Sequence, residues 1–465
     1  MLKTKKYTFW VVVATLLLGV FIPVFYTGVS SLKSADSEFS AQHYSAAADH
    51  YQKAARLLPW RTDLWEKAGI AEYANKDFST AVALLSRSSK HTGPGWVALG
   101  NSYLNLGNTS SALSTYLQAL DYYQSPGLYA GLALIYRNQR DWPAERDALQ
   151  NQLRLDISDA YSHYRLGLLL TLLSPDQAQA ELTLASSLDP KTDSAVQTLT
   201  VALNLSATQP DASQQMLTIG RAFGLVQEWD LALAAFENAT VLDGKNAEAW
   251  AWLGEAKQQL GQIGSVELNR ALALDHTSVI VRALRGLYWN RLGNYEQMRA
   301  EYALAAEVEP TNPAWQASLG DAHLKLGDLA SALTAYQKAT ELAPTDSNYW
   351  RLLAVFCAEN GIRLEDIGLP AAQNAVQLAP GDPFALDALG WAYLSSGRYA
   401  NAEQVLLETI SKYPAHFAAY IHLAMAHLAQ GNRAAAFNQL TYVRDADAGG
   451  EYAVLAEEML KKYFP

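Results

Sequence analysis

A small residue recurs about every 34 residues along almost the whole chain. The series runs Gly69, Gly100, Ala133 and Gly167, and after one break continues with Gly220, Gly254, Gly286, Gly320, Ala354, Gly390 and Ala424. A unit of about 34 residues is too short to bury an apolar core alone, so each copy must stack on its neighbours. The period therefore predicts a linear stack of similar units instead of several globular domains.

Two further signals predict that each unit is a pair of helices, called A and B below. A glycine followed by a polar residue closes helix A in many copies, because glycine adopts the left-handed conformation that ends a helix; these glycines are Gly107, Gly293, Gly327, Gly397 and Gly431. Prolines follow helix B in several copies, at Pro59, Pro190, Pro310, Pro344, Pro380 and Pro414. No segment alternates with period two as a half-buried strand would, so the sequence predicts an all-α protein.

The repeat that shows the pattern most completely contains Met216 to Phe223 followed by Trp229, Ala232, Phe236 and Ala239, and the next repeat begins with Trp250, Leu253 and Gly254. These residues resemble the tetratricopeptide repeat (TPR), whose signature is W-x2-L-G-x2-Y, then A-x3-F, then P. The resemblance covers about residues 30 to 445 and implies a right-handed α-solenoid of about 11–12 helix pairs.

The register of the repeats predicts how the chain is divided. We expect a basic flank at residues 1–8, an apolar segment at 9–29, a first TPR array at 30–192 and an irregular helix with linker at 193–212. A second TPR array at 213–445 and a capping helix at 446–465 complete the chain. The two arrays are expected to stack with a discontinuity at 193–212, because a helix A pattern there is followed by another helix A without a helix B. A short insertion at residues 363–370 is expected to project from one edge.

The segment Phe9 to Val29 contains no charged residue and has about the length that crosses a bilayer as one helix. We expect a single-pass membrane anchor; a cleaved signal peptide is the alternative, although its apolar run is usually shorter. Lys3, Lys5 and Lys6 precede the segment, and this bias predicts a cytoplasmic N-terminus with extracytoplasmic repeats.

The charge balance argues against a nucleic-acid partner. The chain has 35 basic and 46 acidic residues, and four of its lysines lie within the first 33 residues. An acidic repeat region lacks the basic stripe that displaces counterions from phosphates. Attachment to the lipid bilayer is therefore expected to depend on residues 9–29.

The sequence predicts no enzyme, cofactor or metal site. Cys357 is the sole cysteine and occupies a core position of its repeat, so a buried hydrophobic role is expected. His416, His422 and His427 are spaced by six and five residues, which does not align them on one helical face. Phosphate-binding glycine loops are missing, and the repeats leave no room for a catalytic domain.

The resemblance implies that helix A lines a partner-binding groove. The candidate residues in the second array are Arg221, Glu255, Gln259, Asn290, Arg291, Asp321, Lys325 and Arg351, and those in the first array are Asn101, Asn105, Tyr161 and Tyr164. An ordinary solvated helix face is the alternative interpretation of the same residues.

Two functions fit these observations. The first is a membrane-anchored scaffold that binds other proteins, themselves membrane or envelope proteins, and serves assembly or stability of a complex. The alternative is an extracytoplasmic receptor subunit that binds a small ligand or glycan without catalysis.

Overall fold

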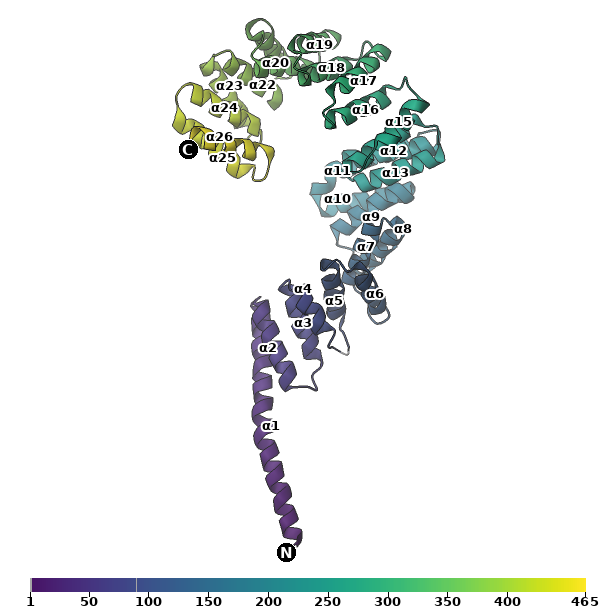
Figure 1. Cartoon of the computed structure of the whole chain (residues 1–465), viewed down its shortest axis with the longest axis vertical. Coiled ribbons are helices and arrows are strands. Elements are labelled where there is room, and N and C mark those ends of the chain that lie inside the picture. Colours follow the sequence, from purple (N-terminus) through teal and green to yellow (C-terminus); the bar gives the residue numbers. More distant parts are fainter. Residues whose placement is uncertain (1, 89) are drawn as a thin grey trace. The chain divides into compact units, whose positions relative to one another are not determined.

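The computed structural model describes the backbone of residues 2–88 and 90–465, and the side chains of residue 19 and of residues 21–88 and 90–465. The described backbone forms 26 α-helices, one short 3-10 helix and one π-helix, without a β-strand (Figure 1). The all-α prediction is therefore confirmed for the described part of the chain.

The helices follow one another with short turns. The first thirteen are α1 (Leu2–Ser40), α2 (Tyr44–Leu57), α3 (Asp63–Ala74), α4 (Phe78–Leu85), α5 (Gly93–Asn105), α6 (Thr109–Leu120), α7 (Pro126–Gln139), α8 (Trp142–Leu155), α9 (Ala160–Leu173), α10 (Pro175–Leu188), α11 (Asp193–Ala207), α12 (Ala212–Leu225) and α13 (Trp229–Leu242), with η1 (Pro190–Thr192) between α10 and α11. The remainder are α14 (Ala247–Gln259), α15 (Ser265–Leu274), α16 (Val279–Arg291), α17 (Tyr295–Val308), α18 (Pro313–Lys325), α19 (Leu329–Leu342), α20 (Ser347–Asn360), η2 (Leu364–Gly368), α21 (Leu369–Leu378), α22 (Pro383–Ser395), α23 (Tyr399–Lys412), α24 (Phe417–Ala429), α25 (Arg433–Ala446) and α26 (Glu451–Tyr463).

The 34-residue series marks the closest approach between helices A and B. A Cβ on Gly100 of α5 would lie 2.2 Å from the Tyr116 ring of α6, and a Cβ on Gly320 of α18 would lie 2.8 Å from the Tyr336 ring of α19. A larger residue at either position would displace an aromatic core side chain. Close packing therefore requires the small residue that recurs in the sequence.

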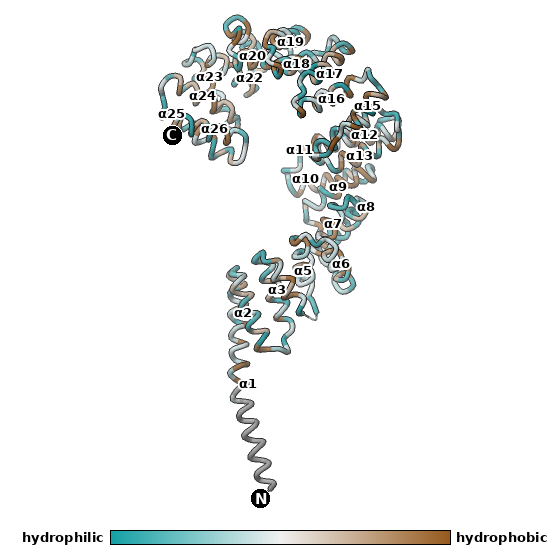
Figure 2. Tube along the Cα trace, viewed as in Figure 1, coloured by the Kyte–Doolittle hydropathy of each residue, from teal (hydrophilic) through white to brown (hydrophobic). Residues whose placement is uncertain are grey.

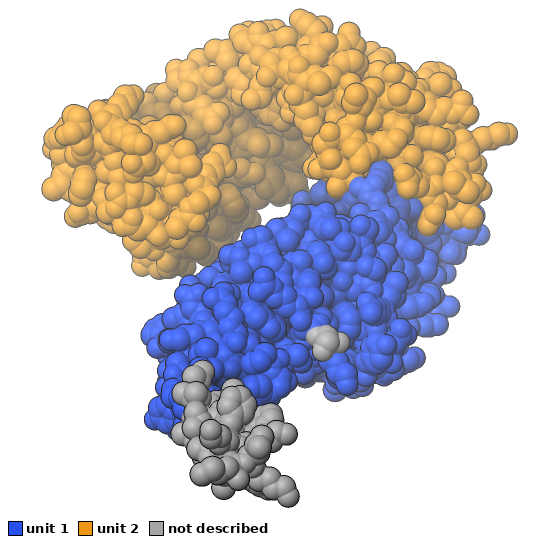
Figure 3. Space-filling model, turned by 60° about the horizontal axis from the view of Figure 1, so that its bottom comes forward, with its two compact units in different colours: residues 1–235 blue, residues 236–465 orange. Residues whose placement is uncertain are grey.

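The chain divides into two compact units, residues 1–235 and 236–465, which are coloured separately in Figure 3. The predicted discontinuity at 193–212 lies within the first unit, where α11 packs against both α10 and α12. Helix α9 also contacts α12. The boundary between the two units falls after residue 235 and not at 193–212, so it does not test the division into two TPR arrays. That division stays a prediction.

An ion-pair network ties α8, α9 and the turn before α13 together within the first unit. The Arg165 guanidinium donates to both carboxylate oxygens of Glu145, with Nε–Oε1 and Nη2–Oε2 distances of 2.6 and 2.9 Å, and both residues are almost fully buried. Arg165 Nη1 also lies 3.3 Å from Glu228 Oε2, and Arg140 pairs with Asp230 at 2.6 Å. Turns that are far apart in sequence are thereby held together near the inserted helix α11.

The N-terminal helix α1 is continuous with the first repeat. Its Ala35 is fully buried, and Asp36 accepts hydrogen bonds from Tyr51 of α2 and Lys67 of α3 at 2.6 and 3.1 Å. Among the described residues, no helix is both long enough and apolar enough to cross a membrane. The side chains of residues 1–18 and 20, which include the predicted flank and half of the predicted anchor, lie outside the described part.

The insertion at 363–370 does not project as the sequence suggested. Residues Leu364–Gly368 form the π-helix η2, whose Leu364 and Ile367 pack on the core of α20 and α21. Gly368 is buried so closely against α20 that an added Cβ would lie 2.7 Å from Cys357 Cβ. The apolar residues of the insertion turn it inward, because they gain more from burial than from exposure to water.

At the C-terminus, α26 packs against α24 and α25 and buries Ala456 and Leu460. Helix α26 thus covers the apolar side of the last helix pair, as the sequence predicts for residues after the final repeat.

Candidate protein-binding surface

The predicted site residues gather on one side of the A helices. Most occur one or five positions after the recurring small residue, and these positions are called the A-helix strip below. In the second unit, α18, α20, α22 and α24 contact one another in sequence order, so their strips form a shared surface. Along the chain, the residues of this surface are in some places bonded to one another and in others open to solvent.

Between α14 and α16 the strip is closed by internal bonds. Arg291 Nη1 donates to Glu255 Oε2 at 2.7 Å, and Gln259 Nε2 donates to Glu255 Oε1 at 2.8 Å. Only 3% of Glu255 is exposed. These three predicted residues are brought together, but they satisfy one another, while Asn290 is half-buried beside them.

Between α18 and α20 the strip is open. Asp321, Lys325 and Glu359 are all exposed, and Lys325 makes no hydrogen bond or ion pair within the described part of the chain. Loss of surrounding water raises the pKa of Asp321, and hydrogen bonding by Tyr336 and the charge of Lys325 oppose this shift. Loss of water likewise raises the pKa of Glu359, against the charges of His422 and Lys325. A free ammonium group thus lies between two carboxylates that are accessible but incompletely hydrated.

The Tyr336 hydroxyl positions one of those carboxylates by donating to Asp321 Oδ1 at 2.5 Å. Tyr336 itself is 3% exposed and packs on Gly320. The repeat core therefore fixes the Asp321 side chain from below and leaves its other lone pairs free for a ligand.

Arg351 extends the open strip toward α22. Its guanidinium lies over the Phe384 ring, 5.9 Å from the centroid, and its buried Nε has no hydrogen-bond partner in the described structure. The Phe384 ring is 57% exposed. Sequence reasoning missed Phe384, although an aromatic residue beside the start of a helix A could have indicated a contact surface.

A buried acid next to this region is hydrogen-bonded to one histidine and lies close to a second. Asp387 Oδ1 lies 2.7 Å from His422 Nδ1, and His416 Nε2 lies 3.6 Å from Asp387 Oδ2. Burial opposes ionisation of Asp387, but the charges of His422 and His416 and the hydrogen bond with His422 outweigh it and hold its pKa below the usual range. His416 precedes α24 as its N-cap residue, so it reaches Asp387 from outside the helix face that carries His422. No group of His, Cys, Asp and Glu in the described structure has the arrangement of a metal site.

The predicted residues of the first unit are largely engaged in internal bonds. Asn101 donates to the Tyr73 hydroxyl at 3.0 Å and accepts from Tyr116 at 2.6 Å, while Asn105 donates to the Asn101 carbonyl. Arg137 donates to the Tyr161 hydroxyl at 2.6 Å, although Tyr161 remains 60% exposed.

Two predicted residues of the first unit remain to be placed. Burial and the charge of Glu228 raise the pKa of Tyr164 to about 12. Arg221 is exposed on α12 and lines a hollow of 500 Å³ between α11 and α12.

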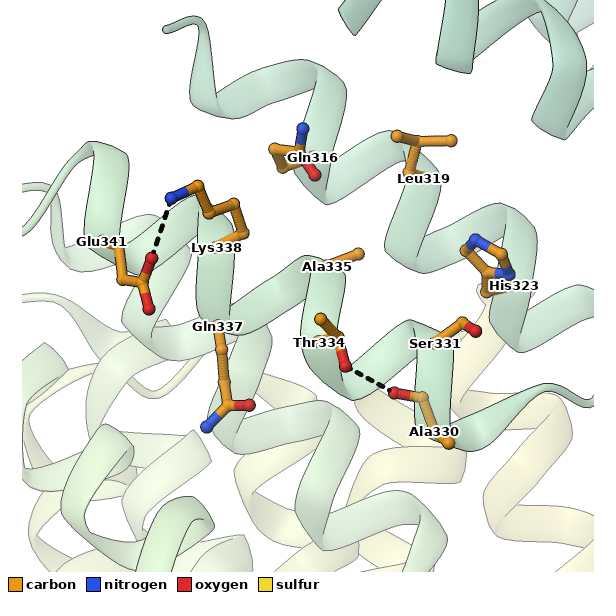
Figure 4. Close-up of a pocket in the computed structure, with 10 residues that line it drawn as sticks. All are labelled: Gln316, Leu319, His323, Ala330, Ser331, Thr334, Ala335, Gln337, Lys338 and Glu341. Atoms are coloured by element: carbon orange, nitrogen blue, oxygen red, sulfur yellow. Dashed lines mark hydrogen bonds and ion pairs between the residues drawn. The ribbon is translucent and has the colours of Figure 1, made fainter. Parts of the chain in front are cut away.

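The opposite side of α18 faces α19 of the same helix pair and carries none of the predicted site residues. Gln316, Leu319 and His323 line a hollow of 580 Å³ with residues of α19 (Figure 4). Lys338 in this hollow pairs with Glu341 at 3.0 Å. The hollow lies within one helix pair and contains no predicted site residue, so it provides a control surface.

Cys357 has the predicted role. Its side chain is fully buried in the core, and burial raises the thiol pKa to about 11, which disfavours the reactive thiolate.

Sequence profiles of the tetratricopeptide repeat match residues 97–161, 291–355 and 388–451. These three segments are tetratricopeptide repeats. The chain is 27% identical over 263 residues to tetratricopeptide repeat protein 37 of Xenopus laevis, covering 54% of this chain and 15% of that protein. It is 25% identical over 264 residues to superkiller complex protein 3 of Homo sapiens, covering 54% of this chain and 16% of that protein. The chain thus spans a small part of the length of these curated relatives.

Solved structures are also similar in fold. Yeast Tom70 is 14% identical with a TM-score of 0.42, and the alignment covers 94% of this chain and 95% of that one. A tetratricopeptide repeat protein from Parabacteroides merdae is 16% identical with a TM-score of 0.44, and the alignment covers 54% of this chain and 98% of that one.

Proposed function

We propose that this TPR chain is a non-catalytic scaffold that holds a partner protein on the open A-helix strip of α18, α20 and α22. The observation that carries the proposal is the unpaired, exposed Lys325 between the carboxylates of Asp321 and Glu359. A polypeptide segment with both charge signs would replace lost water at these carboxylates and pair with the ammonium group.

The neighbouring residues add an apolar contact to this polar one. Phe384 offers an exposed ring whose position is fixed by Arg351 and His416. Rigid aromatic side chains and arginines are frequent anchors at protein interfaces, because they bury a large area at low entropic cost. A protein segment is therefore a better match than a small ion or a nucleic acid.

We further propose that the scaffold is tethered to a membrane through residues 9–29 and serves assembly or stability of a membrane or envelope complex. The support is the uncharged sequence from Phe9 to Val29 and its continuity with α1. The lysine bias before this segment favours extracytoplasmic repeats. Resistance of the full-length chain to carbonate washing of membranes tests the anchor, and protease treatment of intact spheroplasts tests the orientation.

Charge reversal on the open strip tests the binding role. The double variant Lys325→Glu and Arg351→Glu should reduce capture of the partner from detergent-solubilised membranes by at least about tenfold, because interface anchors contribute about 2 kcal/mol or more each. Lys338→Glu, on the opposite side of the same repeat, should capture as the parent does. Equal capture by all three proteins would contradict the proposed surface.

A second candidate function is a receptor for a small ligand or glycan. A hollow of 780 Å³ in the first unit is lined by Trp96, Tyr103, Tyr122 and Tyr123. The Tyr122 ring is 70% exposed, and exposed aromatic faces can stack on sugar rings. A purified protein that lacks protein partners and melts at higher temperature with sugars would favour this function; Tyr122→Ala should abolish that shift.

A further inference from the structure

Three aromatic rings from distant parts of the chain form an exposed stack at the start of the first repeat. The ring centroids of Phe21 and Phe25 on α1 are 6.1 Å apart, and both rings stack on Trp60 at 6.0 and 6.3 Å. Trp60 lies in the turn between α2 and α3. These three residues are called the aromatic stack below.

The aromatic stack is open to its surroundings although its members contact one another. Phe21, Phe25 and Trp60 are 52%, 44% and 54% exposed. Ile22, Val24, Tyr26 and Val29 are exposed on the same helix, so apolar side chains point in several directions around α1 here. Figure 2 shows hydrophobic residues in the coloured part of α1 next to the grey segment. A helix that is apolar on all sides is stable in apolar surroundings and unfavourable in water.

The position of the aromatic stack along α1 is fixed by close packing. Gly28 faces Leu58 so closely that an added Cβ would lie 2.7 Å from Leu58 Cγ. Further along α1, Asp36 binds Tyr51 and Lys67 of the next two helices. No flexible linker therefore separates the apolar part of α1 from the α2–α3 turn.

The number of residues between the aromatic stack and the end of the uncharged segment gives the depth of the stack in the proposed bilayer. Phe21 and Phe25 precede Val29, the end of the uncharged segment, by eight and four residues. At 1.5 Å per residue this corresponds to about 12 and 6 Å along the helix axis. Trp60 contacts both rings and so lies at the same level. With Val29 at the outer side of the headgroup layer, which is about 5–8 Å thick, this level is the boundary between that layer and the hydrocarbon core.

The charges near Trp60 are one ion pair, between Arg61 and Asp63 at 2.7 Å, and one cation without a partner, so this turn has no net negative charge. Arg56 is exposed at the end of α2, four residues before Trp60, and makes no hydrogen bond or ion pair within the described structure. On α1 the first charge after the uncharged segment is Lys33. Tryptophan accumulates where bilayers meet water, and long basic side chains reach from there to headgroup phosphates.

We propose that the α2–α3 turn is a second membrane contact, in which Trp60 enters the interfacial layer of a phospholipid bilayer beside α1. The inference rests on the proposed anchoring through residues 9–29. Its consequence is that the first repeat lies against the bilayer surface, so the start of the TPR region is held in a fixed orientation instead of swinging on a tether.

Spin-label depth measurements on the full chain in nanodiscs of phosphatidylcholine and phosphatidylglycerol test this contact. Single cysteines replace Val13, Trp60 or Tyr122 in separate proteins; native Cys357 is fully buried, so it does not react with the label. A further label at Thr62 keeps Trp60 in place. We expect the label at Val13 to collide only with oxygen. The ratio of collisions with oxygen to collisions with a water-soluble nickel chelate should be several-fold higher for the labels at 60 and 62 than for the label at 122. The label at 122 should collide freely with the nickel chelate, as a label in water does.

The outcomes separate the two proposals. Labels at 60 and 62 that match the label at 122, with Val13 in hydrocarbon, would overturn the second contact and leave the anchor intact. An aqueous label at 13 would overturn the anchor and the second contact together. Labels at 60 and 62 that are shielded from both collision partners, and only at high protein density, would show a second copy covering the aromatic stack, which also contradicts the proposal.

Discussion

Two equivalent repeats, one in each unit, use the same helix position in different ways. In the first unit, Asn101 follows Gly100 and is bonded to Tyr73 and Tyr116. In the second unit, Asp321 follows Gly320 and is bonded by the equivalent Tyr336, but it remains exposed beside an unpaired Lys325. The comparison teaches that repeat register predicts where a side chain points, while its neighbours decide whether it is available to a partner.

The largest effect should come from breaking the buried ion pair of the first unit. Arg165→Met leaves Glu145 buried without its cation and should lower the free energy of unfolding by about 3–5 kcal/mol. Chemical denaturation with hydrogen exchange should locate the loss in residues 1–235. Adding Glu145→Gln should recover part of it, whereas a loss below about 1 kcal/mol would show that the network is not needed to hold the first unit together.

Matched substitutions, one in each unit, that overpack a close helix contact compare how far a loss of stability spreads along the chain. Ala232 and Ala332 are both fully buried at close helix contacts, so replacing either with Leu should destabilise its surroundings by about 1–3 kcal/mol. Repeats couple mainly to their neighbours, so hydrogen exchange should rise around the substituted residue in each variant. Uniform loss of protection along the whole chain after Ala232→Leu would show that the units do not unfold separately.

Removing the equivalent tyrosine hydroxyls sharpens the comparison directly. Tyr116→Phe leaves the amide oxygen of half-buried Asn101 without its donor and should cost about 1 kcal/mol. Tyr336→Phe should cost more, about 1.5–3 kcal/mol, because the lost hydrogen bond is to a carboxylate that has already lost part of its water. A smaller loss than for Tyr116→Phe in thermal unfolding would mean that water replaces the hydroxyl at Asp321.

A smaller, pH-dependent effect is expected for Asp387→Asn. The native pKa of Asp387 is held below its ordinary value of 3.8, so its ionised form stabilises the second unit above that value. This contribution disappears as the pH falls through the lowered pKa. The parent should therefore lose more thermal stability than the variant between about pH 5 and pH 2.5. Parallel melting curves over this range would contradict the role of the His416 and His422 charges.

Local signals predicted much of the fold. The segment 193–212, expected as an irregular helix with linker, contains α11 (Asp193–Ala207), and the segment 446–465, expected as a capping helix, contains α26 (Glu451–Tyr463). Gly107, Gly293, Gly327, Gly397 and Gly431 all have the positive φ that the turn signal required. These features depend on residues within one or two turns of chain, so the sequence pattern contains them.

The candidate site was less predictable because its state depends on contacts between helices. Arg291 and Glu255 are 36 residues apart, and nothing in the pattern shows that they neutralise each other. Glu228 reaches Arg165 across 63 residues because α11 is inserted before α12. The inward positions were identified from the repeat register, but which of them stay open follows only from the packed structure.

Site-specific photo-crosslinking tests the central claim that the strip at α18–α22 is the open one. A photoreactive amino acid replaces Lys325, Asn105 or Lys338 in the full chain, and cells are irradiated before the membranes are solubilised. We expect a discrete protein adduct from position 325 and at most a trace from 105 and 338. Equal adducts from all three positions, or a strong adduct from 105 with none from 325, would contradict the account.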